Sequence, residues 1–210
     1  MAARTWSAAE KFRNNMHMKI KIIPTLVAAL TVVTASSGFA HNPGGKPDPM
    51  NASLASLKGA EFEQGFLQQM IQHHRSGIEM AKLASDQTNR PELRDFASNM
   101  ISTQQQEVDE MSGWLKSWYN ASPKEVANEA ANKEMKMHMS MFSGKRDADF
   151  DKAFLEMMPK HQHIAVEMAE QVEKKATHPE LKEFAAKLAK DQEQEMKQMK
   201  EWAQAWFGPA

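Results

Sequence analysis

The chain has 210 residues and a formal net charge of −1 at pH 7, a length that suits one domain preceded by a targeting segment. A charge this close to zero argues against nucleic-acid binding, and the absence of cysteine excludes disulfides, thiolate zinc sites and iron–sulfur clusters. The 17 methionines far exceed ordinary usage, so soft-metal chemistry in this chain must rely on thioether sulfur and imidazole nitrogen.

The N-terminal residues have the pattern of a secretory signal peptide. Lys19 and Lys21 provide a basic region, residues 22–33 form an apolar run, and residues 38–40 place small side chains before a cleavage site. The run is shorter than the roughly 20 residues that a membrane helix needs. We therefore predict that residues 1–40 are removed, that no stable membrane insertion remains, and that the mature protein is periplasmic or secreted.

The segment after the predicted cleavage site is rich in Pro and Gly up to Pro49, and we interpret residues 41–58 as a flexible N-terminal tether. Beyond the tether, residues 59–207 contain two copies of one sequence, offset by 88 positions without a gap. Shared motifs include Phe-Leu, Glu-Met-Ala and Pro-Glu-Leu, and two Trp residues close each copy. A gapless repeat of this length indicates a duplicated structural unit.

Each copy predicts two helices joined by a short turn. Residues 89–92 and 177–180 both look like capping boxes with a proline in the first turn, so a new helix should begin there in each copy. Apolar residues recur at helical spacing on both sides of these boxes. Two Trp pairs, spaced four apart, are expected at the two ends of the core: Trp114, Trp118, Trp202 and Trp206.

The predicted fold is an all-α, ferritin-like four-helix bundle made from a duplicated helical hairpin. The first hairpin spans residues 59–118, a methionine-rich crossover spans 119–146, and the second hairpin spans 147–207. Residues 122–125 resemble another capping box, so a short extra helix is expected in the crossover.

The first metal-binding candidate lies in the first hairpin. On a helix, Met70, His73, His74 and Met80 share one broad face, and the small residue Gly77 leaves room beside the imidazoles. Adjacent histidines in a methionine stripe can offer a metal two nitrogens, or one nitrogen and one sulfur. The competing interpretation is a methionine-rich core in which both histidines are hydrogen-bonded to polar neighbours.

The second copy offers Met158, His161 and Met168 at matching positions. Gln162 replaces the second histidine, and His163 is rotated about 200° from His161, so we expect His163 on the surface. Pro159 in the same motif is expected only near a helix start or at a kink.

The crossover contributes a third candidate, with four Met and one His in seven residues. If this segment is helical, Met137, His138 and Met141 share a side while Met135 and Met139 face elsewhere. A short helix rarely needs apolar side chains all round, although some of these methionines could simply pack against the bundle.

Neutral thioether and imidazole ligands favour Cu(I), with Ag(I) as a surrogate, over Mg²⁺, Ca²⁺ or Mn²⁺. Zinc remains open through His alone, but the chain lacks the usual zinc motifs. Gln-x-x-Glu occurs twice, at Gln104–Glu107 and Gln192–Glu195, which raises the alternative of a di-metal oxidoreductase. Di-iron bundles use Glu-x-x-His instead, so these residues are expected to orient the facing histidines.

The motifs of residues 66–74, 78–81 and 91–93, with Gln-x-x-Glu and Met-x-x-Trp, resemble the domain-of-unknown-function family three hundred and five. The resemblance covers about residues 61–206 and implies a ferritin-like fold. Some exported members of that family are copper-binding proteins of the CopM type, which implies that His73, His74, Met80, His161, Met168 and the methionine-rich segment through Met141 are ligands. Two positions depart from the family pattern: Gln72 replaces a usual Pro, and Gln162 replaces the usual second His.

The sequence therefore predicts an exported copper-binding protein that sequesters or hands over Cu(I) in copper homeostasis or tolerance, without enzymatic turnover. Its partners would be the metal ion and a periplasmic copper carrier or exporter. A ferritin-like metal-dependent oxidoreductase and a non-metal helical interaction module are the alternatives.

Overall fold

The computed structural model describes residues 48–124 and 129–208, and those residues form six α-helices and no strand. The helices are α2 (Pro49–Ala55), α3 (Gly59–Gln87), α4 (Pro91–Tyr119), α5 (Glu129–Ser140), α6 (Asp147–Lys175) and α7 (Pro179–Phe207). Among them there is no helix long and apolar enough to cross a membrane. The predicted signal peptide lies outside the described residues.

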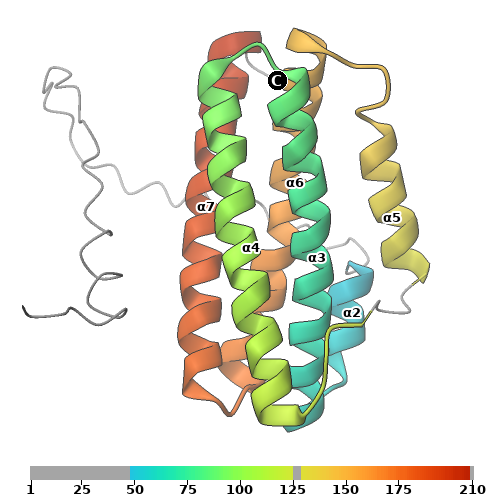
Figure 1. Ribbon diagram of the computed structural model, residues 1–210, viewed down its shortest axis with the longest axis vertical. Coiled ribbons are helices and arrows are strands. Elements are labelled where there is room, and N and C mark those ends of the chain that lie inside the picture. The colour runs from blue at the N-terminus through green and yellow to red at the C-terminus, as the bar shows by residue number, and fades with distance from the viewer. Residues whose placement is uncertain (1–47, 125–128, 209–210) are drawn as a thin grey trace, which may run out of the picture. The chain divides into compact units, whose positions relative to one another are not determined.

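Four long helices form the bundle, and their boundaries follow the sequence repeat (Figure 1). Each of α3, α4, α6 and α7 has 29 residues, and α6 and α7 begin 88 residues after α3 and α4. The hairpins α3–α4 and α6–α7 pack mainly through α3 against α6, which run antiparallel (Figure 1). The predicted all-α bundle from a duplicated hairpin is confirmed.

The buried stripes of the helices meet in two clusters along the bundle. Each cluster combines one end of α3 with the opposite end of α6, because these helices are antiparallel. The first cluster includes Phe62, Phe66, Met70, Met168 and Val172, and the second includes Met80, Ala84, Phe150, Phe154 and Met158. Between the two apolar clusters lies the histidine-containing middle of α3 and α6.

The two tryptophan pairs sit at opposite ends of the bundle. Trp114 and Trp118 stack with their ring centroids 5.0 Å apart, and Trp202 and Trp206 do so at 5.2 Å. Each pair packs against a different core cluster. The ends of the core are thus covered by aromatic rings that are themselves half-buried.

The predicted capping boxes are wrong, although the helices begin where the boxes placed them. The N-cap residues of α4 and α7 are Arg90 and His178, and neither side chain caps its helix. Buried acids from the other hairpin contact these turns instead: Glu63 of α3 binds the α6–α7 turn, and Asp151 of α6 binds Arg90. The turns are therefore fixed by tertiary contacts between the repeats.

Part of the predicted tether is an ordered helix. Asp48 caps α2 through a 2.8 Å hydrogen bond from the amide of Met50, and Leu54 is fully buried against the bundle. Lys175 donates to the carbonyl groups of Leu54 and Ala55 at 2.9 Å each, which satisfies the end of α2. Flexibility from residue 49 onward is thus a wrong prediction, because apolar burial and two caps hold this segment.

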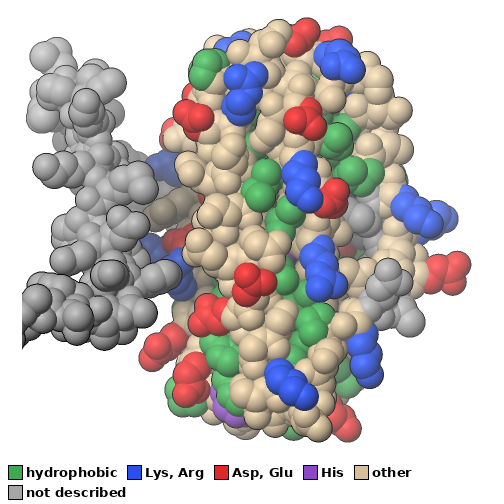
Figure 2. All heavy atoms as spheres, viewed as in Figure 1, with side chains coloured by type: hydrophobic (Ala, Val, Ile, Leu, Met, Phe, Trp, Pro, Cys, Tyr) green, Lys and Arg blue, Asp and Glu red, His purple; other side chains and the backbone are tan. Residues whose placement is uncertain are grey.

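The crossover contains the expected extra helix, α5, which lies alongside the bundle next to α3 (Figure 1). Residues 125–128 and the side chains of residues 130, 131, 134 and 135 are outside the described part, and the predicted capping box at 122–125 lies partly there. Gln72 of α3 donates to Asn132 of α5 at 2.7 Å. On the face of the bundle shown in Figure 2, acidic and basic side chains alternate without a broad region of one charge.

Candidate metal site

Two histidines from different hairpins meet at the centre of the bundle. His73 of α3 and His161 of α6 stack face to face, with centroids 3.7 Å apart and planes 6° from parallel. Both side chains are buried. The Nε2 of His73 lies 2.9 Å from the carbonyl oxygen of His161 and must donate to it, because a carbonyl only accepts.

Both imidazoles are neutral at pH 7. Burial lowers the pKa of His73 to about 3, with the charge of neighbouring His74 adding to the effect. Burial also lowers the pKa of His161 well below its usual range. Because Nε2 of neutral His73 carries the proton, its Nδ1 presents a lone pair, which is the form that binds metals.

These lone pairs have no partner among the described residues. Nδ1 of His73 and both ring nitrogens of His161 are buried without a hydrogen bond. A buried polar atom without a partner costs about 1–3 kcal/mol, so native structures rarely leave several together. The pair has the chemistry expected of ligand atoms.

Four methionines lie in the core clusters on either side of the pair, and all are fully buried. Met70 and Met168 belong to one cluster, and Met80 and Met158 belong to the other. Sequence analysis assigned Met70 and Met80 to one group and Met158 and Met168 to another. The antiparallel packing of α3 and α6 instead pairs each methionine with one from the other repeat.

His74 takes a different direction from His73. Its Nε2 lies 2.8 Å from Oε2 of Glu107 on α4, and its Nδ1 has no partner among the described residues. In the second repeat, Gln162 donates to Glu195 at the matching position. Each glutamate therefore holds the side chain that follows a histidine of the central pair, in agreement with its expected orienting role. Gln162 makes the contact between helices in the second repeat that His74 makes in the first.

Gly77 has a different role from the one predicted. A Cβ at this position would lie 2.5 Å from Oε1 of Gln104, so the glycine makes room for a glutamine and not for an imidazole. Gln104 is itself buried, and its Oε1 has no hydrogen bond among the described residues. The predicted hydrogen bond from this glutamine to a facing histidine is therefore absent from the described contacts.

The methionine-rich helix α5 presents its side chains in three directions. His138 is buried and its ring lies 6.4 Å from that of His161, while Met137 and Met141 are exposed. Met139 packs half-buried against the second core cluster. The predicted shared face of Met137, His138 and Met141 is therefore wrong, and the side chain of Met135 lies outside the described part.

His138 resembles the central pair in its environment. Burial lowers its pKa, and its Nδ1 has no partner among the described residues. His163, by contrast, is half-exposed and lies 3.5 Å from Glu167, in agreement with its expected surface position. Within the described residues, no three side chains of the His, Cys, Asp or Glu type are arranged to hold a metal ion. A metal at the histidine pair would therefore need thioether sulfur as well.

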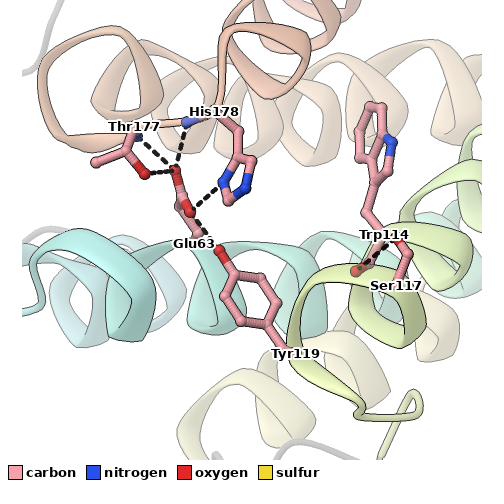
Figure 3. Close-up of polar contacts among 6 residues, drawn as sticks. All are labelled: Glu63, Trp114, Ser117, Tyr119, Thr177 and His178. Atoms are coloured by element: carbon pink, nitrogen blue, oxygen red, sulfur yellow. Dashed lines mark hydrogen bonds and ion pairs between the residues drawn. The ribbon is translucent and has the colours of Figure 1, made fainter.

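A polar cluster at one end of the bundle was missed by the sequence analysis (Figure 3). Glu63 is fully buried, and Tyr119, Thr177 and His178 all point toward its carboxylate. Its Oε1 accepts from the backbone amides of Thr177 and His178, and its Oε2 lies 2.8 Å from Nδ1 of His178. The repeat held a signal for this role, because Asp151 is the acidic residue 88 positions later.

The family model described as "Domain of unknown function (DUF305)" matches residues 31–115 and again 63–203, so together the two matches cover most of the chain. No curated protein matches the chain.

Solved structures are similar over the bundle. CopM in a Cu(I)-bound form is 29% identical, with a TM-score of 0.60, over 70% of this chain and 98% of CopM. CopM in a Cu(II)-bound form gives 28% identity and a TM-score of 0.59, over 69% and 98% of the two chains. A DUF305 protein from Streptomyces coelicolor, described as secreted, is 22% identical, with a TM-score of 0.58 over 65% and 89%.

Proposed function

The chain belongs to the DUF305 family, and from this premise we propose that it is an exported protein that binds copper as Cu(I) through Met and His side chains. It would sequester the ion or hand it over in copper homeostasis or tolerance, with no turnover. The observation that carries the proposal is the stacked, neutral His73–His161 pair, whose buried lone pairs have no partner among the described residues. Thioether sulfur and neutral imidazole are the ligands that Cu(I) prefers.

The ligands that this proposal assigns come from both hairpins. His73 and His161 would supply nitrogen, and buried methionines of the adjoining clusters would supply sulfur: Met70, Met80, Met158 and Met168. The CopM structures in Cu(I)-bound and Ag-bound forms support this choice of metal for a related bundle. Thioether and neutral imidazole ligands need not lose a proton to bind Cu(I).

Export rests on the predicted signal peptide and on the relative described as secreted. The mature protein would be periplasmic or secreted. In these oxidising compartments Cys ligands tend to be lost to disulfides, whereas Met and His ligands are not. A copper carrier or exporter in the same compartment would be the partner that gives or takes the ion.

A competition titration tests the proposal. The exported protein, whose mass should show a start at His41, is titrated with Cu(I) against a chromophoric chelator. We expect the wild type to compete, and His161→Gln to weaken binding at least about tenfold, which is about 1.4 kcal/mol. His163→Gln on the same helix is the matched control and should leave the affinity unchanged, because His163 is half-exposed and lies against Glu167.

Two results would contradict the proposal. If the wild type fails to compete with even a weak chelator, the histidines and methionines only pack the core, and an interaction module becomes the better interpretation. If His161→Gln binds as tightly as wild type while His163→Gln does not, the site lies elsewhere in the chain.

A further inference from the structure

Helix α5 and the turn after it carry two exposed methionines. Met137 is 55% exposed and Met141 is 40% exposed, and no other large hydrophobic side chain among the described residues is classed as exposed. Met141 is the first residue after α5, and its amide donates to the carbonyl of Met137, so the two side chains lie about one turn apart. Two neighbouring exposed thioethers offer soft ligand atoms to the solvent.

The residue next to Met137 faces the interior. His138 is 5% exposed, and its Nδ1 is buried without a hydrogen bond in the described part of the chain. Its ring centroid lies 6.4 Å from that of His161. With metal–nitrogen bonds of about 2 Å, an ion held by one of these imidazoles lies within reach of the other.

The third step is the central pair, because His161 stacks on His73 at 3.7 Å. Soft or borderline ligands therefore form a series from solvent to the middle of the bundle: exposed thioethers, then His138, then His161 and His73.

We infer that α5 is the uptake route for the buried site: Met137 and Met141 capture Cu(I) from solution, and His138 passes it to His161. This inference rests on the proposed copper binding and adds the path to it. Each transfer is a ligand exchange in which one thioether or imidazole replaces another, so the ion stays Cu(I) and no electron or proton is consumed. The same residues would also carry Cu(I) out of the site, because the ion leaves by the reverse of the steps through which it enters.

A kinetic experiment separates the path from the site. Cu(I) is delivered from a chromophoric chelator in a stopped-flow instrument, and the loading rate, the release rate and the equilibrium affinity are measured. Met137→Leu/Met141→Leu removes both sulfurs but keeps exposed apolar side chains with high helix propensity. We expect loading and release each to slow about tenfold while the affinity stays within about twofold, because changing a path changes both rates equally.

His138→Gln should show the same pattern, and His163→Gln should load at the wild-type rate. Wild-type loading by the double methionine variant would overturn the route, and the exposed pair would then be left for contact with a partner protein. A parallel loss of affinity would also overturn it, because Met137 and Met141 would then be the final ligands. Failure of the wild type to bind Cu(I) at all would overturn the proposed function itself, which the other two outcomes leave standing.

Discussion

At the residue scale, Glu63 shows how a buried charge can hold the two repeats together. Burial by itself would raise the pKa of its carboxyl group, but hydrogen bonds from Tyr119, His178 and Thr177 lower it from 4.5 to about 2. The carboxylate thus connects the start of α3, the end of α4 and the turn before α7 (Figure 3). A charge with this many donors stabilises the fold in its ionised form.

The lowered pKa predicts the pH dependence of stability. Because the folded-state pKa lies below the unfolded value, the contribution of Glu63 is complete above about pH 4.5 and is lost as the pH falls toward 2. The shift corresponds to about 3 kcal/mol. Urea unfolding at several pH values should therefore show a smaller acid dependence in Glu63→Gln, together with lower stability at pH 7. Glu61→Gln, at an exposed site of the same helix, should follow the wild type, and an unchanged acid dependence in Glu63→Gln would contradict the assignment.

Single residues were also where prediction from sequence failed. Asn89 and Thr177 were expected to cap helices, yet Glu63 and Asp151, which are distant in sequence, contact these turns. Gly77 was expected beside a histidine, yet it accommodates Gln104 from the next helix. In each case the partner comes from another helix, and a spacing rule within one helix has no information about it.

At the element scale, the four long helices could be predicted because each one carries its own 3.6-residue apolar period and a proline marks two of the starts. Helix α2 could not be predicted, because seven residues are too few to show a helical period. Its stability comes from contacts with Lys175 and with the surface of α6. The sequence also could not show that α3 packs directly against α6. His73 and His161 were therefore predicted to belong to two separate groups of metal ligands, whereas their rings stack on each other.

Helix α6 contains an element-scale test in Pro159, which occupies the interior of a 29-residue helix and not its start. Proline cannot donate to the carbonyl of Leu155 and is about 3 kcal/mol less favourable than alanine inside a helix. Pro159→Ala should therefore raise the free energy of unfolding by about 1–3 kcal/mol in urea denaturation. Lys160→Ala, at the exposed next position, should change it by no more than about 0.5 kcal/mol. Lower stability in Pro159→Ala would mean that the helix needs the proline geometry for its packing.

At the scale of the whole molecule, the duplication is close to symmetric in its scaffold and asymmetric in its chemistry. Trp118 stacks on His178 at one end, and Trp206 lies under Arg90 at 4.0 Å at the other. Near the centre, however, His74 in one repeat corresponds to Gln162 in the other, and only the crossover supplies His138. The uptake route through α5 would therefore reach the central pair from the α6 side alone.

A metal held by His73 or His161 together with buried methionines would contact both hairpins, because each core cluster combines methionines of the two repeats. Its effect should therefore appear in the stability of the whole domain. A ligand at 100 times its dissociation constant adds about 2.7 kcal/mol, which for a domain of this size raises Tm by roughly 5–10 °C. We expect Ag(I), a redox-inert substitute for Cu(I), to produce this rise in calorimetry and Mg²⁺ to produce none, because thioethers bind hard ions poorly. His73→Gln/His161→Gln should keep its helical content but lose the Ag(I) response. If the double variant still responds fully, the ion stabilises the bundle from another site, and the metal does not join the two hairpins through these histidines.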